Sequence, residues 1–357
     1  MSIQERSPGR GLDRVVSVHR GVMNDRMRKR LEITALSLPA LIMFVGFVIV
    51  PVIMAAYYGF YRWKGFGQPS VNGQFIGLQN YGMILTDPNF HDALKHTLLV
   101  MIASLIIQGP LAILFALLLN QKFKGRAIIR TLIFVPYVVS EVIVGTAWSL
   151  MLQSTGAVNA LLNSIGLPGA DWIADPNIAF WTLMFIISWK YIGFAVILMI
   201  AGMQSIPEEL YEAAMVDGAG FWRRQWSITL PLLGPTIRIW AFMSIIGSLQ
   251  LFDLVYIVWG QYVAGTAGTS TMATYMVREG RLANNYGYGS AVAVVIFIIS
   301  LAIALTYQRL VLNRDLDGAI TTARGEKERR RKERDRALKH GGGDGGDAEI
   351  ASEVAGL

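Results

Sequence analysis

Two residues of opposite charge lie inside otherwise apolar stretches of this sequence. Glu141 and Lys190 fall at similar estimated depths in two stretches that would run antiparallel. Ionisable side chains are costly in a bilayer, so those that occur there pair with one another or mark the path of a solute. We therefore predict an intramembrane ion pair between Glu141 and Lys190, with the alternative that Lys190 faces a solute route.

The other residue types that carry chemistry are absent or scattered. The chain has no cysteine, which excludes disulfides, thiolate metal sites and cysteine nucleophiles. Its four histidines show no metal-ligand spacing. No lysine is followed by serine or threonine, so there is no P-loop, and no G-x-S-x-G motif occurs. We predict a protein that is not an enzyme and that holds no metal or cofactor itself.

The apolar stretches that would position these residues resemble membrane spans. Of the 357 residues, 53% are hydrophobic and only 16% are charged, against about a quarter in a soluble domain. A span of about 20 apolar residues crosses the bilayer core, and it must be helical because lipid cannot bond backbone amides. We predict an all-α membrane protein with six spans at Ala35–Tyr58, Thr97–Leu119, Ala127–Leu152, Ile178–Met203, Leu232–Gly260 and Tyr286–Leu310.

The basic residues predict how these spans are oriented. The two termini and the second and fourth connections hold 25 lysines and arginines, whereas the other three connections hold five. Cytoplasmic segments carry the excess of positive charge, so both termini should face the cytoplasm. This divides the chain into a basic arm (1–34), a membrane domain (35–312) and a charged, glycine-rich, disordered tail (313–357). The basic ends are expected to be solvated anchors rather than nucleic-acid binders.

The connection over 205–231 has an unusual pattern. Ser205, three residues before Glu208, predicts a capping box at the start of a short helix, with Pro207 in its first turn. Asp217-Gly218 predicts a turn after this helix, and aromatic residues follow in a second amphipathic element. By composition alone, the segment is typical of a helix that lies on the bilayer surface.

The order of residues in this connection adds a second interpretation. Glu212-Ala213-Ala214, then Gly218, then Ile228-x-Leu230-Pro231 resembles the EAA loop of permease subunits of ATP-binding-cassette (ABC) importers. Similarity to the carbohydrate-type, maltose-permease-like family covers roughly residues 35–312, and the first external loop favours the first of the two permease types that pair in such systems. This wider similarity includes Phe75–Tyr81, Asp87-Pro88, Asn159, Trp172 and Leu251–Tyr256.

The resemblance implies a mechanism with several partners. The loop would be a cytoplasmic coupling helix between spans 4 and 5 that docks on a separate ATPase dimer, which binds ATP and Mg²⁺. A second permease would complete the path, and an extracytoplasmic binding protein would deliver a sugar or oligosaccharide. The coupling residues implied are Glu212, Ala213, Ala214, Asp217, Gly218, Ile228, Leu230 and Pro231. The substrate-path residues implied are Lys190, Tyr191, Phe194, Ser244, Gly247, Ser248 and Leu251.

Two alternatives stay open from the sequence. The same architecture could import glycerol phosphate or a polyol, because Lys190 could face a phosphate. A secondary transporter that works alone would need internal repeats and coupling carboxylates in broken helices, but the sequence shows no clear repeat and the 205–231 loop would have no role. The expected location is the cytoplasmic membrane of a prokaryote. Departures from the family pattern at His96 and over 260–266 leave the identity of the solute open.

Overall fold

The structure is a computed structural model that describes residues 25–121 and 123–312. The chain divides into two compact units, residues 1–54 and 55–357, which are described separately. Residues 1–24 of the predicted basic arm and the predicted disordered tail, 313–357, lie outside the described residues, so both stay predictions.

The first unit is helical wherever it is described. It contains α1 (Asp25–Phe44), the π-helix η1 (Val45–Ile49) and the start of α2 (Val50–Tyr58). The helix begins ten residues before the predicted span at Ala35, so the last part of the predicted arm is helical. Residues 25–34 contain no proline or glycine that would break the helix. Long basic side chains such as those found here can reach the interface from within a membrane helix. Lys29–Tyr58 is apolar and long enough to cross a bilayer.

The described residues contain four to six membrane spans. Four helical segments meet the length and composition of a span: Lys29–Tyr58, Pro88–Leu119, Ala179–Gln204 and Tyr286–Val311. Two bent pairs raise the number to six if each pair is one span: Arg126–Val138 with Glu141–Met151, and Phe221–Leu232 with Gly234–Leu249. The predicted helical membrane class is therefore confirmed, while the exact count of six is a prediction.

The second span begins nine residues earlier than predicted. It consists of α5 (Pro88–Ala103), the π-helix η2 (Ser104–Gln108) and α6 (Gly109–Leu119). The Asp87 carboxylate caps α5 by accepting from the Asn89 amide at 2.8 Å, and Pro88 occupies the first turn. These two residues set the start, because a capping carboxylate and a first-turn proline both favour a helix N-terminus.

The third span is broken, contrary to the predicted continuous helix Ala127–Leu152. The chain bends by 95° between α7 (Arg126–Val138) and α8 (Glu141–Met151). Val139 is extended, and Ser140 caps α8 by accepting from the Val142 amide at 3.3 Å. Pro136 weakens the last turn of α7, since proline cannot donate to the helix ladder.

The fifth span also departs from its prediction of Leu232–Gly260. The helix α14 (Gly234–Leu249) ends at Leu249 with Gln250 as its C-cap, and α15 (Asp253–Thr266) is a separate element with a non-helical Gly260. At this break the Leu251 carbonyl accepts a hydrogen bond from the Thr271 hydroxyl at 2.6 Å. Backbone groups at such a break need partners in a membrane protein, and a distant segment supplies one here.

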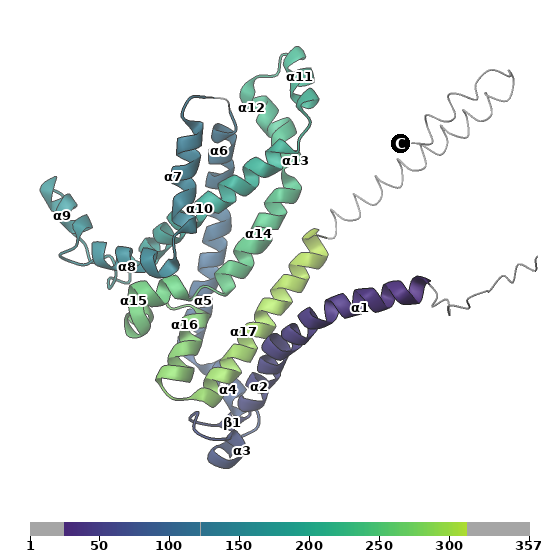
Figure 1. The fold of residues 1–357 in the computed structure, drawn as a ribbon. Helices are drawn as coiled ribbons and strands as arrows, with labels where there is room; N and C mark the ends of the chain where they lie inside the picture. Colours follow the sequence, from purple (N-terminus) through teal and green to yellow (C-terminus); the bar gives the residue numbers. More distant parts are fainter. Residues whose placement is uncertain (1–24, 122, 313–357) are drawn as a thin grey trace, which may run out of the picture. The chain divides into compact units, whose positions relative to one another are not determined.

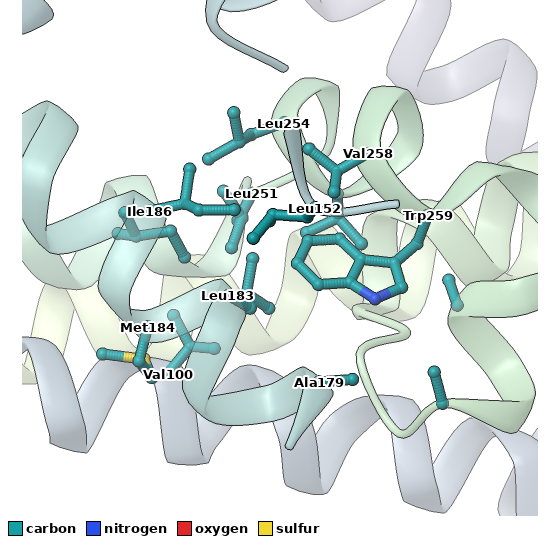
Figure 2. Close-up of a cluster of buried hydrophobic side chains, with 14 of the residues drawn as sticks. Val100, Leu152, Ala179, Leu183, Met184, Ile186, Leu251, Leu254, Val258 and Trp259 are labelled. Atoms are coloured by element: carbon teal, nitrogen blue, oxygen red, sulfur yellow. The ribbon is translucent and has the colours of Figure 1, made fainter. Parts of the chain in front are cut away.

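The most buried helix of the second unit is α10 (Ala179–Gln204), which packs against α6, α7 and α14. Gly193 allows this packing, because a Cβ there would collide with the backbone of Ile133 in α7. Small residues at such contacts let membrane helices approach closely. Figure 2 shows a second part of the core, where Leu183 of α10 lies with Val100 of α5 and with Leu254 and Trp259 of α15.

The remaining elements form the loops and the last span. A two-stranded antiparallel sheet pairs β1 (Tyr61–Arg62) with β2 (Gln74–Phe75). Figure 1 places this sheet at the opposite end of the second unit from α11 (Glu208–Val216) and α12 (Phe221–Arg224). The other elements are α3 (Pro69–Asn72), α4 (Gln79–Thr86), α9 (Ala157–Ser164), α13 (Leu230–Leu232), α16 (Met272–Val277), α17 (Tyr286–Tyr307) and the π-helices η3 (Gln225–Thr229), η4 (Arg278–Leu282) and η5 (Gln308–Leu312).

Candidate functional site

The first candidate region is the connection that holds α11, α12, η3 and α13. The predicted capping box is wrong: α11 begins at Glu208 with Pro207 at its N-cap, where no side chain caps the helix. Ser205 instead ends α10, and its hydroxyl donates to the Gly202 carbonyl at 2.7 Å. Pro207 lies before the first turn rather than within it. The acidic Glu208 and Glu209 still suit the positive end of α11.

Gly218 ends α11 through its left-handed backbone. Its φ is +74°, a conformation that residues with a Cβ rarely adopt. The Ala219 amide donates to the Ala214 carbonyl at 2.9 Å, and the Gly218 amide donates to the Met215 carbonyl at 3.0 Å. These are the two bonds of a Schellman motif. The turn that the sequence predicted at Asp217-Gly218 is present, and it sets the direction in which the chain leaves α11.

Side chains tie α11 to the following π-helix. The Tyr211 hydroxyl lies 3.0 Å from the Thr229 hydroxyl, which in turn donates to the Gln225 side-chain oxygen at 2.7 Å. Thr229 is buried. The two arms of the connection are therefore held as one body rather than as a loose loop.

The predicted coupling residues lie on both arms of this body. Glu212, Ala213, Asp217, Gly218 and Pro231 are exposed, and Ala214, Ile228 and Leu230 are partly buried. Large apolar side chains beside them are also exposed, most of all Val216, at 88% of its surface. Such a surface is typical of a protein or membrane contact. It also includes Leu210, Met215, Trp222 and Trp226.

The second candidate region is a cavity of about 410 Å³ between the spans. Six of the seven predicted substrate-path residues line it: Tyr191, Phe194, Ser244, Gly247, Ser248 and Leu251. The resemblance missed several others, which come from α5, η2, α7, α10 and α14: Val100, Ser104, Gln108, Tyr137, Ile187, Trp240 and Met243. An isolated amide just before Gly109-Pro110 in an apolar span was a signal for Gln108, since polar residues inside membranes are seldom accidental.

Lys190 does not belong to the lining of this cavity. It is 2% exposed, and its ammonium donates to the Val139 carbonyl at 2.8 Å and to the Pro136 carbonyl at 3.5 Å. Glu141 instead accepts from the Tyr191 hydroxyl. The direct Glu141–Lys190 ion pair is thus not formed, because the break between α7 and α8 frees carbonyls that take the ammonium. A broken span was not foreseen from the sequence, so these acceptors were not considered.

The motif residues of the loops are hydrogen-bonding centres. Asn80 is buried and donates to the carbonyls of Gly59 at 2.8 Å and Tyr61 at 3.0 Å, which joins α4 to the end of the first span. Asn159 is a hydrogen-bonding centre of the third loop. It accepts from the Trp172 indole at 2.8 Å and donates to the Ala170 carbonyl at 2.9 Å.

Asp87 connects the start of the second span to α16 and α17. Its carboxylate accepts from the hydroxyls of Tyr275 and Tyr288, the latter at 3.1 Å. Burial opposes ionisation of Asp87, but hydrogen bonds from Tyr275, the Asn89 amide and Tyr288 outweigh it, so its pKa lies below the ordinary value. The carboxylate is thus a structural acceptor. No cluster of three metal-ligating side chains occurs among residues 25–121 and 123–312.

The sequence matches a known family. Residues 108–317 match the profile of the binding-protein-dependent transport system inner membrane component. The chain belongs to this family. The match includes the connection 205–231 and all described cavity-lining residues except Val100 and Ser104, and it confirms the family that the sequence resembled. The family is a component of transport systems rather than an enzyme family.

Individual relatives agree with this assignment. The trehalose/maltose transport system permease protein MalF of Thermococcus litoralis is 31% identical over 274 residues, which cover 76% of this chain and 91% of that protein. Two solved structures of bacterial ABC transporters for the acidic polysaccharide alginate each superpose with a TM-score of 0.69. They are 28% and 27% identical, cover 80% of this chain, and cover 98% and 96% of their own chains. The second is a complex with a periplasmic protein that binds an alginate pentasaccharide.

Proposed function

We propose that this chain is one permease subunit of an ABC importer for a sugar or oligosaccharide. Family membership supports the transport role, and the names of the trehalose/maltose and alginate relatives support the solute class. The observation that carries the proposal is the cavity between the spans, lined by aromatic rings and hydroxyls. Aromatic faces suit sugar rings, and hydroxyls suit sugar hydroxyls.

The remaining parts of the importer are separate chains in this proposal. A second permease forms the other wall of the path, and an extracytoplasmic binding protein delivers the sugar. A cytoplasmic ATPase dimer binds ATP and Mg²⁺, and it also binds the surface around Glu212, Ala213 and Gly218. Closure of that dimer moves α11 and reorients the spans between outward-open and inward-open states. Both termini lie in the cytoplasm of a prokaryotic cell.

Glycerol phosphate is the weaker candidate for the solute. It would need a positive charge in the path, and Lys190 was the residue that could supply one. The ammonium of Lys190 is bonded to the carbonyls of Val139 and Pro136. None of the described residues that line the cavity is charged. An uncharged polyol fits the same chemistry as a sugar and is separated from it by uptake measurements.

The decisive experiment is gentle solubilisation of the tagged chain from its native membrane, followed by mass spectrometry of what co-purifies. We expect a second permease with six spans and an ATPase, and a crosslink from the 205–231 connection to that ATPase. Recovery of the chain alone after crosslinking would contradict the proposal and favour a transporter that works by itself. Chains carrying a crosslinker at Ser164, in α9 on a connection predicted to face the other side of the membrane, serve as the matched control.

A further inference from the structure

One polar side chain in the cavity has an amide nitrogen that no described residue bonds. Gln108 is 4% exposed and lines the cavity, and its amide nitrogen Nε2 is buried without a hydrogen-bond partner among the described residues. A buried amide donor that stays unbonded costs about 1–3 kcal/mol. Buried polar groups are almost always satisfied, so this exception indicates a partner that the described residues do not supply.

The backbone around Gln108 explains how the amide reaches the cavity. The span widens into the π-helix η2 at Ser104–Gln108, where the Gly109 amide donates to the Ser104 carbonyl five residues back. Pro110 follows and cannot donate to the helix. Single π turns of this kind recur at functional sites. Ser104, at the other end of the turn, also lines the cavity and lies 2.8 Å from the Ser244 hydroxyl of α14.

The rest of the cavity wall is aromatic and uncharged. Tyr137 and Phe194 stack with ring centroids 5.0 Å apart and 22° between their planes. Trp240 comes close to α6, because Gly109 has no side chain to keep the indole away. The described lining residues include hydroxyls and one amide but no charged group. An anionic sugar would lose its hydration here without gaining a cation, which is unfavourable in a low-dielectric site.

We propose that Gln108 determines specificity, by donating from its amide to a hydroxyl of an uncharged sugar held against the aromatic wall. The inference rests on the proposed import function. It adds that the solute is uncharged and that Gln108 recognises one of its hydroxyls. It also separates this chain from a transporter of acidic alginate, because none of the described lining residues could neutralise a carboxylate. A site that bonds a hydroxyl rejects the analogue that lacks it, since its own polar group is then left unpaired.

The test uses the complete complex in lipid vesicles, with its binding protein and ATP. Uptake is measured for maltotriose, arabinotriose and an alginate trisaccharide, and then for monodeoxy analogues of the better neutral sugar. We expect neutral uptake at least tenfold above alginate uptake, and one monodeoxy analogue transported about tenfold more slowly than its parent. Gln108→Leu should slow the parent about tenfold and remove the difference between the parent and that analogue.

Matched variants separate recognition from folding. A purely structural role for Gln108 would slow the parent and its analogues equally, so an unchanged ratio in Gln108→Leu would overturn the proposal. If Gln108→Leu fails to assemble, Gln108→Asn, which keeps the amide, is compared in the same way and should change which analogue is rejected. Gln121→Leu removes an exposed amide from the next connection and should match the wild type.

Two further outcomes concern the charge class of the solute. Preference of the wild-type complex for the alginate trisaccharide, or no uptake of either neutral sugar by a complex that contains its ATPase, would overturn the inference alone. Failure of the proposed function has a different signature. In that case no ATPase co-purifies, and none of the three sugars is taken up with or without ATP.

Discussion

At the scale of single residues, several side chains act by bonding backbone groups that the fold leaves open. Lys190 donates to the carbonyls at the break between α7 and α8. Asn80 donates to the carbonyls of Gly59 and Tyr61, just after the first span. In lipid such groups have no water to bond, so each must find a partner within the protein. The family motifs at Asn80 and Asn159 therefore reflect loop structure rather than contact with a solute.

Lys190→Met tests the structural role of the buried ammonium. The methionine is unbranched and one atom shorter than lysine, and it removes the donors to the Val139 and Pro136 carbonyls. We expect a loss of about 1–3 kcal/mol, seen as a lower midpoint of thermal unfolding of the purified complex. Lys95→Met, at an exposed position of α5, is the control. Equal midpoints for the two variants would show that the carbonyls do not need the lysine.

Asp87→Asn tests the contact between the second span and the tyrosines of α16 and α17. The folded pKa of Asp87 is depressed, so its carboxylate stabilises the fold above the ordinary value of about 4. That contribution is lost as the pH falls through the folded pKa. We expect the wild type to unfold at a higher temperature than Asp87→Asn at pH 7, and the two to converge in acid. A gap that stays constant down to pH 3 would argue against the carboxylate.

At the scale of elements, interruptions of helices place the candidate site. The turn η2 carries Ser104 and Gln108, and the packing of α7 on α10 puts Tyr137 beside Phe194, just before the bend. The cavity is lined by α5 and η2, by α7 before its bend, by α10, and by α14 with Leu251 just after its end. Interrupted helices are tolerated inside membranes where they face protein or a polar space. The cavity is thus built both by spans that depart from the predicted continuous helices and by α10, which is continuous as predicted.

The end of α11 supports a prediction about coupling. Gly218→Asp forces a residue with a Cβ into a left-handed conformation and adds a charge to the exposed turn. We expect at least a tenfold fall in ATP-driven uptake while the amount of chain in the membrane is preserved, and the same for Glu212→Lys. Gly166→Asp has a similar backbone cost in the loop after α9, where φ is +79°, and should transport normally. Wild-type uptake in both coupling variants would refute the role of this turn.

At the scale of the whole molecule, the orientation in the membrane decides which loop meets which partner. The excess of lysine and arginine predicts that the 205–231 connection faces the cytoplasm. The chain has no cysteine, so a single introduced cysteine reports its own location. The exposed positions Ser164 and Ser227 lie in α9 and η3, on connections predicted to face opposite sides.

We expect Ser164→Cys to react with a membrane-impermeant maleimide on intact spheroplasts. Ser227→Cys should react only after the membrane is permeabilised. The wild type, which lacks cysteine, gives the background for both measurements. Labelling of Ser227→Cys from outside would reverse the proposed topology and would place α11 out of reach of an ATPase.

The sequence alone determined the membrane class and the approximate ranges of the four spans that form unbroken apolar helices, and its motifs indicated the family by resemblance. The class and the spans follow from hydropathy and charge, which are properties of composition, whereas the family follows from the resemblance of the motifs to a known pattern. The approximate range of the fourth span and the turn at Gly218 were predictable for this reason. Six residues of the cavity wall were also foreseen, through the resemblance to the family.

Only the tertiary structure decided the breaks in the third and fifth spans, the partners of Lys190 and the place of Gln108 in the cavity. Each depends on groups far apart in the chain. The Leu251 carbonyl after α14 accepts a hydrogen bond from Thr271, and the Val139 carbonyl at the bend accepts one from Lys190. Hydropathy records how well a segment suits lipid, but not which distant side chain bonds a carbonyl, so a broken span and a continuous one have the same sequence signal.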